Sequence, residues 1–86
     1  MKESAAARVA ETIDDAWSFW GDDESKVNSA FRMLKDKVQV SQVAKAYQRL
    51  YNIHLIDKLN DRMSDDEIKT ILSIVSALPP YRTLNG

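Results

Sequence analysis

The sequence predicts an all-α protein, a compact bundle of five helices in a single domain. Five segments place apolar residues at the three-to-four-residue spacing of a helix, and none shows the sustained alternation of a strand. The connections between segments span about two to five residues, which suits antiparallel neighbours in a bundle. The expected helices cover residues 4–20, 23–36, 40–51, 54–62 and 65–78.

The first two segments have clear boundaries. The first ends at Gly21, because a residue without a Cβ readily takes the left-handed conformation that follows a helix. The second opens with Asp22-Asp23-Glu24, whose carboxylates favour the positive end of a helix. The expected core residues of the first segment are Ala6, Val9, Ile13, Ala16, Trp17 and Trp20, and those of the second are Val27, Ala30, Phe31 and Leu34.

The last three segments have equally clear boundaries. Asn52 follows the third, since asparagine tolerates the left-handed conformation almost as well as glycine. Ser64 and Glu67 form the sequence pattern of a capping box at the start of the fifth, and Pro79-Pro80 ends it. The expected inward residues are Val40, Val43, Tyr47, Leu50 and Tyr51, then Leu55, Ile56, Leu59 and Met63, then Ile68, Ile71, Leu72, Val75 and Leu78.

The composition is that of a soluble globular protein. The chain has 86 residues, enough for one small domain that buries a little over ~60% of its unfolded surface. A net charge of −1 gives no long-range field that would collect nucleic acid or an acidic membrane, and the lack of cysteine excludes disulfides. No secretory signal is recognisable, and no apolar run approaches the ~20 residues of a membrane span. We therefore expect a cytoplasmic or virion-associated protein.

Three motifs in sequence are similar to the pattern of one annexin repeat, a unit of five helices. They are Trp-Ser-Phe-Trp-Gly-Asp-Asp-Glu at 17–24, Ala-Tyr-Gln-Arg-Leu-Tyr-Asn-Ile-His-Leu at 46–55 and Met-Ser-Asp-Asp-Glu at 63–67. The resemblance covers about residues 5–78. It implies a right-handed five-helix domain over 1–78, followed by a tail or linker at 79–86. As a single unit, the chain resembles the annexin-like units of bacterial or phage multidomain and virion proteins.

Annexins bind calcium and phospholipid, and the resemblance implies where that site would lie. The family uses carbonyl oxygens around two glycines and a carboxylate near the end of the fourth helix, because calcium needs about six to eight oxygen ligands. Here Phe19 and Gly21 stand at the two glycine positions, beside Trp17, and Arg62 stands where the acid is expected. Asp61 lies one residue earlier, about 100° around the helix. We expect no metal site at these positions and no cofactor.

Acidic clusters at 14–15, 22–24 and 65–67 are compatible with either helix capping or a cation site. Two of them stand at predicted helix starts, where each carboxylate stabilises the exposed N–H groups by about 0.3–1 kcal/mol. The resemblance places these two starts at one end of the bundle, with Arg62 as a neutralising neighbour. Capping is the interpretation we favour, and a cation or a basic partner is the alternative.

No pattern predicts catalysis or nucleic-acid recognition. His54 is the single histidine and has no aligned nucleophile or carboxylate, so we expect it to begin the fourth helix. The serines lack a nucleophile elbow, and Gly21 is the single internal glycine, too few for a phosphate loop. Residues 40–47 resemble the first helix of a helix-turn-helix, but residues 55–62 balance two acids against two bases. We expect no specific nucleic acid as partner.

The candidate partner-binding residues are Phe19, Met33 and Ile74. Phe19 lies at the edge of the first apolar stripe, where it would either cover the open end of the bundle or anchor a partner or membrane. Met33 and Ile74 lie off the main apolar faces, with Ala46 beside them, and would join into one contact patch if their helices are neighbours. We expect a non-enzymatic interaction or structural module that binds another protein or itself. A peripheral phospholipid-binding module with weak or lost calcium dependence is the alternative.

Overall fold

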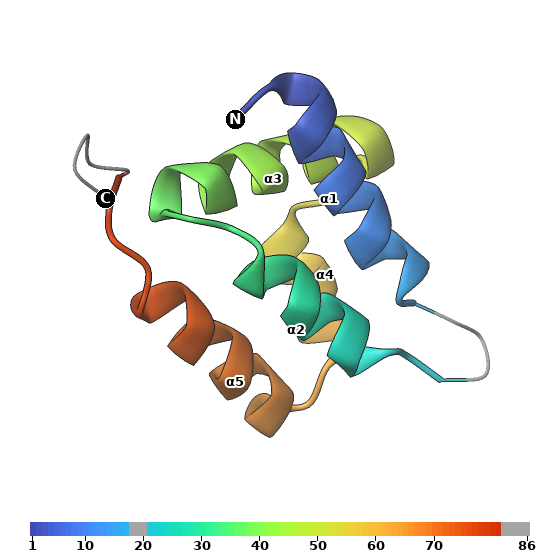
Figure 1. Ribbon diagram of the computed structural model, residues 1–86. Helices are drawn as coiled ribbons and strands as arrows, with labels where there is room; N and C mark the ends of the chain where they lie inside the picture. Colours follow the sequence, from blue (N-terminus) through green and yellow to red (C-terminus); the bar gives the residue numbers. More distant parts are fainter. Residues whose placement is uncertain (18–20, 82–86) are drawn as a thin grey trace.

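The computed structural model confirms the all-α class. It describes residues 1–17 and 21–81, and this part of the chain forms five helices: α1 (Glu3–Asp15), α2 (Glu24–Arg32), α3 (Lys37–Tyr51), α4 (Leu55–Arg62) and α5 (Asp65–Ser76). Helix α1 packs against α2 and α3, α2 also packs against α5, and the short α4 contacts α3 and α5 (Figure 1). Within the described ranges, no helix has the length and apolar character to cross a membrane.

The predicted capping box at the start of α5 is present. The Glu67 backbone N–H donates to the Ser64 hydroxyl oxygen at 3.3 Å, and the Ser64 N–H donates to the Glu67 carboxylate at 2.8 Å. At the start of α2, the Asp23 carboxylate accepts from the Lys26 N–H at 3.1 Å. These bonds satisfy N–H groups that the helix itself leaves without partners. The sequence therefore identified both starts correctly.

Four helix boundaries differ from the prediction by two residues or more. Helix α1 ends at Asp15 and not near residue 20, because the N–H of Ala16 turns back to Ile13 and tightens the last turn. Helix α2 ends at Arg32, four residues early. Helix α3 begins at Lys37, three residues early, because the buried Asp36 caps it by accepting from the Gln39 N–H at 2.7 Å. Helix α5 ends at Ser76, two residues early.

The densest part of the core lies among α1, α2 and α3. The largest fully buried side chains are those of Tyr47, Phe31, Ile13, Val27 and Val43. Ala46, which was expected beside an exposed patch, is only 1% exposed. Helix α5 contributes Ile71 as its buried residue. The bundle is thus best packed around α1 and becomes more open toward α4 and α5.

Three apolar residues that were expected to face the core are exposed. Ile56 is 70% exposed, Leu72 is 57% exposed and Leu50 is 43% exposed. The prediction was wrong at these positions because the apolar stripes of the outer helices are wider than the surfaces that their neighbours cover. Helix α4 contacts only α3 and α5 closely, so one side of its stripe stays in solvent.

The first residues of the predicted tail are tied to the start of α3. The Lys37 backbone N–H donates to the Pro79 carbonyl at 2.9 Å, and the Lys37 ammonium donates to the Leu78 carbonyl at 2.8 Å. These bonds hold Leu78 and Pro79 against the start of α3. Residues 82–86 lie outside the described part of the chain.

Asn52 generates the first prediction. It ends α3 in the left-handed conformation, at φ 59° and ψ 33°, with its N–H donating to the Gln48 carbonyl at 2.8 Å. Asn52→Val should lower the free energy of unfolding by about 1–2 kcal/mol, because a branched side chain is disfavoured in this conformation. Asn52→Gly should leave the free energy of unfolding unchanged, because glycine readily takes the left-handed conformation. Urea denaturation checks both variants, and equal stability of the two would contradict the assignment.

Candidate functional site

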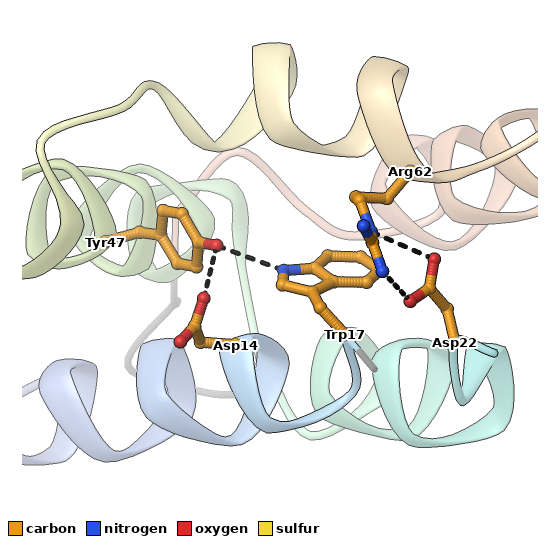
Figure 2. A network of polar contacts seen from close by, with 5 residues as sticks. All are labelled: Asp14, Trp17, Asp22, Tyr47 and Arg62. Atoms are coloured by element: carbon orange, nitrogen blue, oxygen red, sulfur yellow. Dashed lines mark hydrogen bonds and ion pairs between the residues drawn. The ribbon is translucent and has the colours of Figure 1, made fainter. Parts of the chain in front are cut away.

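A chain of hydrogen bonds joins the end of α1 to the middle of α3 (Figure 2). The Tyr47 ring is fully buried, and its hydroxyl donates to the Asp14 carboxylate at 2.8 Å. The same hydroxyl accepts from the indole N–H of Trp17 at 3.0 Å. Burial, followed by the hydrogen bond to Asp14, raises the pKa of Tyr47 far above its ordinary value, so the hydroxyl stays protonated. Trp17 is therefore held as a packing residue, as the sequence predicted.

A second polar contact joins α4 to the loop between α1 and α2. Arg62, the last residue of α4, binds both carboxylate oxygens of Asp22, and its Nε lies 3.1 Å from the Oδ2 atom (Figure 2). The Asp22 side chain is only 19% exposed and that of Arg62 31%, so the pair is partly shielded from water. The hydrogen bond to Asp22 raises the pKa of Arg62. The expectation that Arg62 neutralises this acidic end is confirmed.

The starts of α2 and α5 meet at one end of the bundle, as the resemblance implied. Glu24 and Glu67 stand in the first turns of these two helices. Hydrogen bonding to Glu67 and the nearby negative charge of Glu67 raise the pKa of Glu24. The hydrogen bonds from Glu24 and Ser64 lower the pKa of Glu67. The two carboxyls therefore compete for one proton in acid.

We use the term loop corner for Trp17, Gly21, Asp22, Asp61 and Arg62. Within the loop corner, the Arg62 and Asp22 side chains bind one another. Gly21 has φ of 143°, a conformation that favours glycine, and Asp61 is exposed. In the described ranges, no three histidine, aspartate or glutamate side chains are arranged to hold a metal ion. Phe19, the remaining sequence candidate at this loop, lies outside the described residues.

The structure brings together a different set of residues between the two last helices. A groove of about 220 Å³ separates α4 from α5, and it is lined by Ile56, Leu59, Asn60, Ile68, Ile71 and Leu72. Leu59 and Ile71 are buried and form its floor, whereas Ile56 and Leu72 are mostly exposed at its sides. We call this feature the α4–α5 groove. The sequence did not predict this groove, because Ile56 and Leu72 lie on apolar stripes that were expected to be covered.

Charged residues of both signs occur on the two helices that border the α4–α5 groove. Asp57, Asp61, Asp65 and Lys69 are exposed, and Lys58 is half-buried. At about 100° per helix residue, Asp61 and Lys58 both stand well away from the lining residue Ile56. The charge near the groove is therefore mixed.

The Met33 and Ile74 pair does not form the exposed patch that was expected. Their helices are neighbours, and Met33 is 67% exposed at the end of α2. Ile74, however, is half-buried and packs against the core, so the prediction that it points away was wrong. The reason is that α2 covers the side of α5 on which Ile74 stands. Met33 remains as a single exposed apolar residue.

A second, polar pocket of about 200 Å³ lies between α1 and α3. Its lining consists of Met1, Glu3, Ala6, Gln42, Lys45 and Arg49. The Glu3 carboxylate pairs with the Arg49 guanidinium at 2.7 Å, and both side chains are largely exposed. An exposed ion pair of this kind contributes about 0–1 kcal/mol, and Lys45 adds one further positive charge to the lining. The α4–α5 groove has the more exposed apolar residues at its sides and is the stronger candidate for docking.

Comparison of the chain with models of protein families, with curated proteins and with solved structures found no match. Functional inference thus depends on the geometry of the described residues.

The hydrogen bonds of Tyr47 generate the second prediction. Tyr47→Phe should lower the free energy of unfolding by about 1–3 kcal/mol, because Trp17 and Asp14 lose their shared partner while they remain partly buried. Tyr51→Phe is the matched control, since Tyr51 is only half-buried, and it should cost less. Chemical denaturation measures both values. Equal losses would mean that the Tyr47 hydroxyl contributes no special stabilisation.

The carboxyl pair generates the third prediction. Because the pKa of Glu24 is raised above 4.5, the folded chain binds this proton more tightly than the unfolded chain does. The resulting stabilisation is complete below about pH 4.5 and is lost as the pH rises through the folded-state pKa. Glu24→Gln should therefore be more stable than the wild type at neutral pH, where it removes the repulsion with Glu67. This advantage should shrink in acid.

Thermal denaturation across the pH range from 3 to 7 checks that expectation. Asp66→Asn, which removes a carboxylate next to Glu67 at the start of α5, is the control. If the difference in stability between Glu24→Gln and the wild type stays constant with pH, the two carboxyls do not compete for a proton.

Proposed function

We propose that this chain is a non-enzymatic module that docks onto another protein through the α4–α5 groove. The observation that carries the proposal is the exposure of Ile56 and Leu72, at 70% and 57%, on either side of a hollow with an apolar floor. Burying apolar surface contributes roughly 25 cal/mol per Å². Apolar anchors that enter such hollows supply most of the energy in protein interfaces.

The placement of these two residues supports docking better than their exposure alone. Single exposed apolar residues are common on protein surfaces and need no function. Ile56 and Leu72 come from different helices, yet both line the same groove. A partner that enters the groove would cover both at once. Met33 has similar exposure but does not line this groove.

The loop corner supports a non-enzymatic assignment. Its polar groups are engaged, since Arg62 holds Asp22, and the Trp17 indole donates to the Tyr47 hydroxyl outside the corner. Such contacts stabilise the fold, and they leave these groups poorly placed to bind and activate a substrate. A structural or accessory role in a bacterial or phage assembly accords with a docking module, and it rests on the annexin resemblance.

Peripheral phospholipid binding is the competing function, and one feature weighs against it. The Arg62 guanidinium uses both carboxylate oxygens of Asp22 and adds a positive charge at the loop corner, which opposes calcium there. Co-sedimentation with anionic vesicles at millimolar calcium, lost in Phe19→Ala, would favour the membrane function instead.

The docking proposal generates the fourth prediction. Ile56→Glu should weaken binding to the natural partner at least ~10-fold, which corresponds to about 1.4 kcal/mol. The substitution should change the free energy of unfolding by less than about 0.5 kcal/mol, because Ile56 is exposed. Met33→Glu is the matched control, with 67% exposure on another helix, and should keep the partner.

The measurement has two stages. A protein retained by the immobilised wild-type chain is identified, and its affinity for the purified wild type and both variants is then measured by calorimetry. Sedimentation velocity of the chain alone tests a second copy as partner. If Met33→Glu loses the partner and Ile56→Glu retains it in full, the docking surface lies at the end of α2 and not at the groove.

A further inference from the structure

We draw no further inference here: the strongest candidate, the apolar α4–α5 groove between Ile56 and Leu72, belongs to the docking site already proposed, and nothing in the described part of the chain shows what covers it.

Discussion

The arrangement of this bundle depends on burying Tyr47 with its hydroxyl fully bonded. A phenol can enter a core only if its O–H finds partners, and here the Asp14 carboxylate and the Trp17 indole supply them. The two partners come from the end of α1 and the residues just after it, whereas Tyr47 comes from α3. The ring therefore fixes how α3 packs across α1, and it determines where the chain leaves α1 to enter the following loop.

The position of that loop determines which surfaces remain open. With Trp17 held against α3, Asp22 comes within reach of Arg62 at the end of α4. An acidic loop that would otherwise attract a cation is thereby neutralised by a residue of the same chain. Helix α4 is held at its end by this pair, and its Ile56 side faces solvent opposite Leu72 of α5. The α4–α5 groove thus follows from the same contacts that close the loop corner.

Features that depend on a few neighbouring residues could be predicted from the sequence. Asn52 ends α3 in the left-handed conformation, and Ser64 with Glu67 caps α5, because both effects arise within one helical turn. Arg62 was also expected to neutralise the acidic end of the bundle, although that expectation required the annexin resemblance. The candidate partner-binding residues depend on contacts between helices, so the sequence predicted their surroundings less well. Ile74 was expected to be exposed and packs against the core.

The sequence by itself determined the helical class, the number of apolar segments and the caps at Asn52 and Ser64, because periodicity and capping are local properties of the chain. Only the tertiary structure decided which part of each apolar stripe is covered. Ile56 and Ile71 have the same type of side chain on similar stripes, yet one is 70% exposed and the other 3%. The difference arises because burial depends on which neighbouring helix lies against a face, and that neighbour is brought there by contacts distant in sequence, such as Asp14 with Tyr47.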